Sequence, residues 1–193
     1  MAKKGRKEQL PDQPGRYDLA TIVVTAAALV LWLLLPGAKV TGEALVVAAL
    51  LQAVRLARWH GLAAAEDPLL LVLHIGYAWL VIGLLLLGLS ILTPDVPQTA
   101  AIHAIGVGAV ATMILAVTTR ASLGHTGREL RASHRIVAAY ALLSLAAIAR
   151  VATGFGALDY LTGLRIAAAL WAGAFILFLI VYGPILTKPR VGE

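Results

Sequence analysis

The chain has 193 residues, of which 60% are hydrophobic and only 13% are charged, and its mean hydropathy is +0.87. A water-soluble domain has about 45–50% apolar and about 25% charged residues, so this composition excludes a soluble globular protein. The net charge is +6 and cysteine is absent, which excludes disulfides, thiolate metal sites and cysteine nucleophiles. Because the basic residues lie at the ends of apolar segments, membrane topology accounts for them and no nucleic-acid partner is expected.

The first 17 residues are polar, basic and interrupted by proline. They predict a separate arm (1–17) that lies near the lipid headgroups, followed by a transmembrane domain (18–187) and a short tail (188–193). The first apolar segment is long enough to span a membrane and is not followed by a small-residue cleavage pattern. It is therefore interpreted as a retained helix and not as a cleaved signal peptide.

Six segments are apolar and long enough to cross about 30 Å of hydrocarbon as helices. In chain order they are Leu19–Pro36, Glu43–Trp59, Pro68–Leu92, Gln98–Thr119, Ser133–Thr153 and Thr162–Ile185. The second is the weakest, since Arg55 and Arg58 interrupt its end. The sequence therefore predicts an all-α, polytopic integral membrane protein with about six transmembrane helices in contact with the lipid bilayer.

The basic residues also predict an orientation. With the N-terminus in the cytoplasm, only Lys39, Arg150 and Arg165 of the 16 Lys and Arg residues fall on the outer side. Cytoplasmic loops of membrane proteins carry an excess of Lys and Arg, so both termini are predicted to be cytoplasmic.

The five histidines are the clearest candidates for metal ligands. His74 and His103 fall inside predicted spans, where ionisable residues are functional candidates by default. His125 and His134 fall in the cytoplasmic loop between the fourth and fifth spans or at its edge. His60 is expected only to lie at the membrane interface.

Depth separates these candidates into two layers. At 1.5 Å per residue, His74 lies ~9 Å below the cytoplasmic surface, Met113 lies at a similar depth, and His103 lies ~8 Å below the outer surface. A copper site is one hypothesis, formed by His74 and Met113 with His125 or His134, because a thioether is a soft ligand that favours Cu(I).

A haem site is the second hypothesis, in which His103 binds the iron and Arg150 binds a propionate. One stripe of the fourth span, at helical spacing, holds His103, Gly106, Val110 and Met113. Gly106 and Gly108 are expected to leave room beside His103 for another helix or a flat ligand. The alternatives stay open at this point: each intramembrane histidine bonds only to a neighbouring helix, and Met113 only fills a gap in the packing.

Two stretches carry a resemblance: LHIGYAW at 73–79, and AIHAIGVGAVATMILAVTTRASLGHTGR at 101–128. They resemble the C-terminal half of the NnrS family, bacterial polytopic membrane proteins associated with haem, with copper and with the response to nitric oxide. The resemblance implies that His74, His103 and His125 are candidate ligands for haem or copper. It also implies that Arg120 and Arg128 bind haem propionates or acidic lipid.

The resemblance further implies a place in the bacterial cytoplasmic (inner) membrane and nitric oxide as a ligand. Family members are usually longer and have a first half with its own histidine-rich motif. This chain is therefore expected to be a fragment, a split subunit or a shortened relative. Its metal sites could then be completed by a second copy of the chain or by a partner chain.

Three functions follow from these residues and this resemblance. The first is an NnrS-like haem and copper protein of the nitric oxide response. The second is a b-type cytochrome-like electron carrier, and the third is a metal-free structural or transport half-module. No hydrolase signature is present and no acidic residue lies in mid-bilayer, which argues against a proton relay. A reductase needs an electron input, and no flavin or nicotinamide site is visible. The sequence therefore does not distinguish an enzyme from a binding protein.

Overall fold

The computed structural model describes residues 15–59 and 65–191. Within these ranges the protein is all-helical, and six helices are long and apolar enough to cross a membrane. Their bounds are α1 Arg16–Leu34, α2 Lys39–Ala57, α3 Pro68–Leu92, a fourth span made of α4 Gln98–His103, the π-helix η3 Ala104–Ala111 and α5 Thr112–His125, then α6 His134–Gly154 and α7 Tyr160–Thr187. Residues 1–14 of the predicted arm, and His60, lie outside the described residues.

The predicted fold class is confirmed: the chain is a polytopic membrane protein with six membrane-length helices. Three of the helices start at a side chain that caps their free backbone N–H groups. The Asp67 carboxylate accepts from the N–H of Leu69, Ser133 Oγ accepts from Ile136, and the Asp159 carboxylate accepts from Thr162. The first helix starts at Arg16, three residues before the predicted start of the first span.

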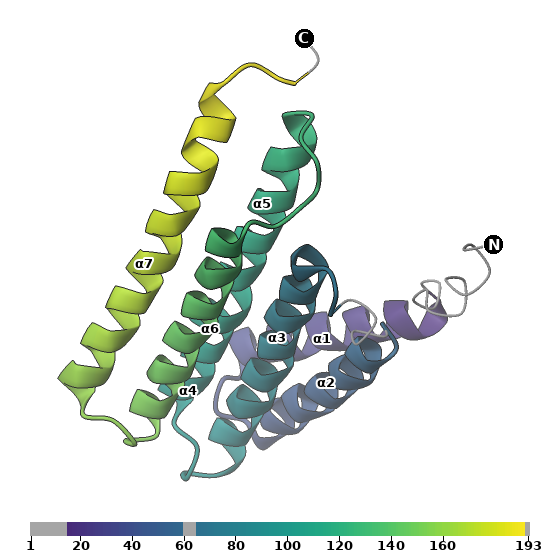
Figure 1. Ribbon diagram of the computed structural model, residues 1–193. Helices are drawn as coiled ribbons and strands as arrows, with labels where there is room; N and C mark the ends of the chain where they lie inside the picture. Colours follow the sequence, from purple (N-terminus) through teal and green to yellow (C-terminus); the bar gives the residue numbers. More distant parts are fainter. Residues whose placement is uncertain (1–14, 60–64, 192–193) are drawn as a thin grey trace.

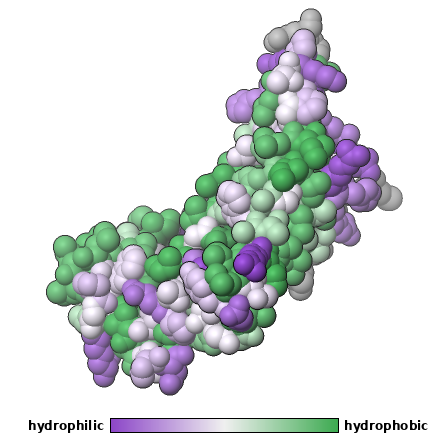
Figure 2. All heavy atoms as spheres, turned by 90° about the vertical axis from the view of Figure 1, so that its left-hand side faces the viewer, coloured by the Kyte–Doolittle hydropathy of each residue, from purple (hydrophilic) through white to green (hydrophobic). Residues whose placement is uncertain are grey.

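Each helix packs mainly against its neighbours in the chain (Figure 1). Helix α3 lies between α2 and the fourth span, and α6 lies between the fourth span and α7. Two buried clusters hold this array together, one around Leu84 and Leu87 of α3 and the other around Leu115 of α5 and Leu143 of α6. In consequence α1 and α7 are the least buried spans. The face in Figure 2 is mostly apolar, as a surface against lipid requires.

The chain runs back and forth, so the helix ends form two sets. We call one set the basic end: the starts of α1, α3 and α6 and the ends of α2, α5 and α7. This end carries most of the Lys and Arg residues and is the one that the sequence predicts to be cytoplasmic. The other set, the opposite end, holds the short connections α1–α2, α3–α4 and α6–α7 (Figure 1).

The main departure from the expected helices is in the fourth span. Directly after His103 the chain forms a π-helix of 8 residues, η3, before it returns to α-helix at Thr112. Hydrogen bonds in a π-helix join residues five apart, so each residue turns through a smaller angle than in an α-helix. The stripe expected from His103 through Gly106 and Val110 to Met113 assumes an unbroken α-helix. Because η3 lies between His103 and Met113, the residues after His103 are rotated around the helix axis relative to their expected positions.

Candidate functional site

His74 lies in the second turn of α3, near the basic end. Its Nδ1 lies 3.0 Å from the carbonyl oxygen of Leu70, one turn earlier in the same helix. A carbonyl only accepts, so Nδ1 carries a proton in this bond, and the tautomer of this kind has its lone pair on Nε2. That Nε2 atom is buried and has no hydrogen-bond partner. In metal-binding histidines, too, a bond at one ring nitrogen orients the other.

Aromatic rings form a wall beside His74. The Trp59 ring meets the His74 ring edge-on at 6.1 Å between centroids and lies 4.6 Å from the Tyr77 ring. The guanidinium of Arg55 lies 5.2 Å from the centroid of Trp59. Contacts of this cation–π type hold both partners in place. Trp59 therefore fixes the His74 ring from the α2 side.

Behind this wall lies a set of polar side chains that joins α1, α2 and α3. Arg55 Nε donates to Asp18 at 2.9 Å, and Arg55 Nη1 donates to the Tyr77 hydroxyl at 3.0 Å. The Tyr77 hydroxyl donates to Gln52 Oε1, and Gln52 Nε2 donates to Thr25 Oγ1 at 2.8 Å. We call these five residues the Arg55 network. Since each member is bonded, the network makes the three helices one rigid unit next to His74.

Met113 lies on α5, which packs against the other side of α3. A Cβ built on Gly76 would lie 2.8 Å from Met113 Sδ, so the thioether fills the space that this glycine leaves. Gly76 is two residues after His74 and lies about 200° further around the helix, so Met113 packs on a different face of α3 from the one that carries His74. Packing accounts for Met113 in this position.

His103 lies at the end of α4 and touches Arg150 of α6. Arg150 Nη2 meets His103 Nε2, and a guanidinium only donates, so Nε2 accepts and the ring is neutral with its proton on Nδ1. The second guanidinium nitrogen, Arg150 Nη1, is buried and has no partner. An unpaired buried donor on a cation matches an anionic group such as a carboxylate.

The two glycines of η3 differ in what surrounds them. A Cβ on Gly108 would lie 2.6 to 2.8 Å from ring atoms of Trp79, so the indole of α3 already fills the space beside it. At Gly106 no atom lies within 4 Å of such a Cβ, and this residue is exposed. The room that the sequence predicts next to His103 is therefore present at Gly106 only. π-Helical turns are often found at functional sites, and here one starts directly after His103.

The Gly-His-Thr-Gly sequence at 124–127 forms the end of α5. Gly127 has a φ of +68°, the N–H of Arg128 bonds to the carbonyl of Leu123, and the N–H of Gly127 bonds to that of Gly124. These two bonds define a Schellman C-cap, which favours glycine at the left-handed position. The N–H of Val191 donates to Thr126, so the C-terminal segment docks onto this cap. Gly127 therefore has a structural role, while His125 is exposed.

The remaining predicted residues lie at the basic end. His134 starts α6 and is exposed, and Arg128 Nη1 donates to the Thr126 carbonyl at 3.3 Å. Arg120 lies on α5 next to the buried Thr119, whose hydroxyl contacts Tyr140 at 2.6 Å. Across residues 15–59 and 65–191, no group of three or more His, Cys, Asp or Glu side chains is placed to hold a metal ion.

Sequence reasoning did not find Trp59, Gln52 and Arg55 as neighbours of His74. A signal was available, because Gln52 is a polar residue in an apolar span, and Arg55 and Trp59 follow it at helical spacing on the same face. The partners of these residues on α1 and α3 could not be deduced from spacing, since they depend on how the helices pack.

No curated protein and no solved structure matches this chain. A family model described as NnrS protein matches residues 2–190. The match covers essentially the whole chain. It therefore also includes the first, second, fifth and sixth spans, which carry none of the resembling motifs. The chain belongs to the NnrS family, which is associated with the response to nitric oxide.

Proposed function

We propose that this chain is a metal-binding membrane protein of the nitric oxide response, placed in the bacterial cytoplasmic membrane. His74 binds a metal through Nε2, and His103 with Arg150 forms a separate haem-binding site near the opposite end. Membership of the NnrS family supports the general role, and the side chains described above support the metal sites.

The observation that carries the proposal is the buried Nε2 atom of His74, which has no hydrogen-bond partner. A buried acceptor without a partner costs about 1–3 kcal/mol, so such atoms are rare without a reason. A metal ion would use this lone pair. The Leu70 carbonyl and the Trp59 ring already hold the imidazole in one orientation, so little ordering is left for the binding step.

Copper is proposed as the metal at His74 because an imidazole ligand suits copper, while Met113 packs on another face of α3, against Gly76. His125 and His134 are exposed at the basic end and are candidates for further ligands. A second copy of the chain, or a partner chain, is proposed to complete the coordination.

Haem suits the His103 site because a neutral imidazole and an unpaired buried donor lie side by side. Arg150 now donates to Nε2, so this nitrogen must be released before it binds iron, and the guanidinium is then free to pair with a propionate. The open space at Gly106 is on the same span. A ferrous haem or a cuprous ion would supply the centre that binds nitric oxide, a small neutral molecule that enters the bilayer.

A bis-histidine electron carrier is less well supported. His74 is near the start of α3 at the basic end, and His103, the last residue of α4, is near the start of the fourth span at the opposite end. Two ligands of one haem iron must lie at the same depth, and these two histidines do not.

The test is the metal and haem content of the purified full chain and of three variants. We expect His74→Ala to lose most of the copper and to keep haem, and His103→Ala to lose haem and to keep copper. His60→Ala replaces the one histidine that is assigned to neither site and serves as the matched control, with at most a small effect. Equal copper in the wild type and in His74→Ala would contradict the first site. Equal haem in the wild type and in His103→Ala would contradict the second.

A further inference from the structure

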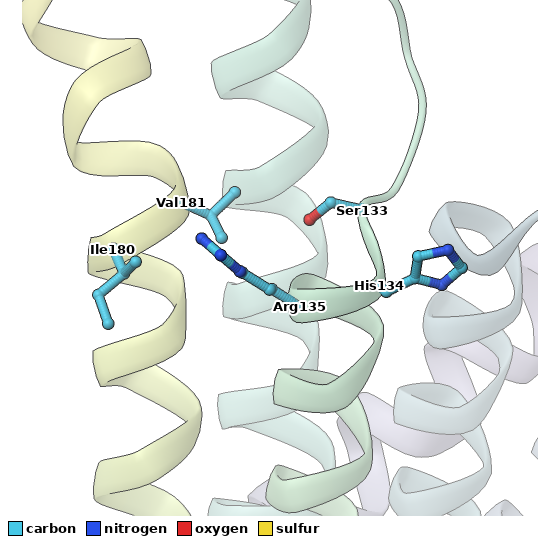
Figure 3. Close-up of a pocket in the computed structure, with 5 residues that line it drawn as sticks. All are labelled: Ser133, His134, Arg135, Ile180 and Val181. Carbon is cyan, nitrogen blue, oxygen red and sulfur yellow. The ribbon is translucent and has the colours of Figure 1, made fainter.

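A cavity of about 440 Å³ lies between the start of α6 and the side of α7, near the basic end. Its lining combines polar groups from Ser133, His134 and Arg135 with the apolar side chains of Ile180 and Val181. Figure 3 shows Arg135 reaching across toward Val181 of α7, while His134 points to the other side of α6. The cavity therefore has one cationic wall and one apolar wall.

The lengths of α6 and α7 indicate the depth of this cavity in the membrane. Helix α6 has 21 residues, a rise of ~31 Å, which matches the ~30 Å of hydrocarbon in a bilayer. Helix α7 has 28 residues and continues for seven residues beyond Ile180. Arg135, in the first turn of α6, thus lies at the level of the lipid headgroups, in a recess beside the longer α7.

Arg135 has no carboxylate partner within the part of the chain that the structure describes. The ion pairs found there are Lys39–Glu43 and Arg55–Asp18, both on other helices. The Arg135 side chain is exposed, and so is that of Arg131 just before the helix, which lines an adjoining cavity with Ser133 and His134. No ion pair with a described acidic group therefore balances the positive charge in this recess.

We propose that this recess binds an anionic phospholipid, with its phosphate on Arg135 and the upper part of its acyl chain against Ile180. A guanidinium matches a phosphate with two parallel hydrogen bonds. Ser133 Oγ accepts from the N–H of Ile136, so its own proton remains free to donate to the phosphate. Ile180 is 52% exposed on the lipid side and offers apolar surface directly below. A headgroup with a net negative charge is thereby preferred over a zwitterionic one.

The experiment measures how much phosphatidylglycerol and phosphatidylcholine remain bound to the full chain. The protein is taken from mixed micelles that hold both lipids in equal amounts, and bound lipid is counted by native mass spectrometry. We expect Arg135→Gln to lower phosphatidylglycerol binding about fivefold, since one Arg near an anionic surface contributes on the order of a factor of five. Phosphatidylcholine binding should not change, and Arg135→Lys should restore part of the preference.

Arg165→Gln is the matched control, because it removes the same charge from an exposed position near the start of α7 at the opposite end. It should leave phosphatidylglycerol binding unchanged. Equal lipid binding in Arg135→Gln and in the wild type would overturn the proposal. Displacement of the lipid by inorganic phosphate would also overturn it, because the site would then recognise a free anion and not a lipid. Circular dichroism shows whether each variant is folded.

Discussion

Gly108 packs closely against Trp79 in the span that carries His103, and its replacement by alanine gives a quantitative test. A Cβ at this position would lie 2.6 to 2.8 Å from three ring atoms of Trp79. The optimum between carbon atoms is ~3.5–4.0 Å, so the new methyl group would overlap a rigid indole by about 1 Å. Overpacking of this kind costs about 1–3 kcal/mol, and we expect Gly108→Ala to lower the free energy of unfolding by that amount.

Gly106→Ala is the matched control, since it lies in the same π-helix and its Cβ would meet no atom within 4 Å. It should be neutral, or stabilising by up to ~1 kcal/mol because alanine restricts the unfolded chain more than glycine does. Both variants can be unfolded reversibly in mixed micelles with increasing SDS and followed by circular dichroism. If the two variants unfold at the same SDS fraction, the assigned contact between Gly108 and Trp79 is wrong.

A double variant separates the contact from other effects of the methyl group. In a Trp79→Leu background the ring is absent, so Gly108→Ala should cost less than ~0.5 kcal/mol. An undiminished cost in that background would locate the strain in the π-helix itself.

Three further predictions concern a helix cap, the Arg55 network and an acidic cap. Gly127→Ala should destabilise the protein by ~1–2 kcal/mol, because alanine is strained at a φ of +68°, whereas Gly124→Ala at an open position should not; SDS unfolding of the two variants compares them. Tyr77→Phe removes the hydroxyl that joins Arg55 to Gln52 and should cost ~0.6–1.7 kcal/mol in the same assay, with the exposed Tyr160→Phe as a neutral control. The backbone N–H of Thr162 lowers the pKa of Asp159, so the charged carboxylate stabilises α7 at neutral pH and loses this effect as the pH falls through the lowered pKa, below 3.8. Asp159→Ala should therefore be less stable than the wild type at pH 7 and equally stable once the wild-type carboxyl is protonated; a difference that persists in acid would contradict this.

The six spans could be predicted because a membrane imposes a length and a composition that each segment must satisfy by itself. Even the second span, interrupted by Arg55 and Arg58, forms α2 up to Ala57. The π-helix could not be predicted in this way, since residues 104–111 read as an ordinary apolar helix. The π-helix also breaks the predicted stripe from His103 to Met113, because that stripe assumes the same rotation per residue throughout the span.

In the candidate site, too, some features could be predicted from the sequence and others could not. Single residues such as His74, His103 and Arg150 stand out because polar groups are costly in hydrocarbon. Their partners on other helices depend on how the helices pack, so the Trp59 ring beside His74 does not follow from spacing. The Gly-His-Thr-Gly sequence contains a helix stop signal that can be read from its second glycine, and the structure uses it as one.

The most direct test of the central claim is the visible absorption spectrum of the detergent-purified full chain, first oxidised, then reduced with dithionite, and finally exposed to nitric oxide. We predict a Soret band that shifts on reduction and again when nitric oxide is added, and whose intensity falls in His103→Ala. A chain with no haem absorption and no bound copper would contradict the account. It would leave His74 Nε2 and Arg150 Nη1 as buried polar atoms without a ligand.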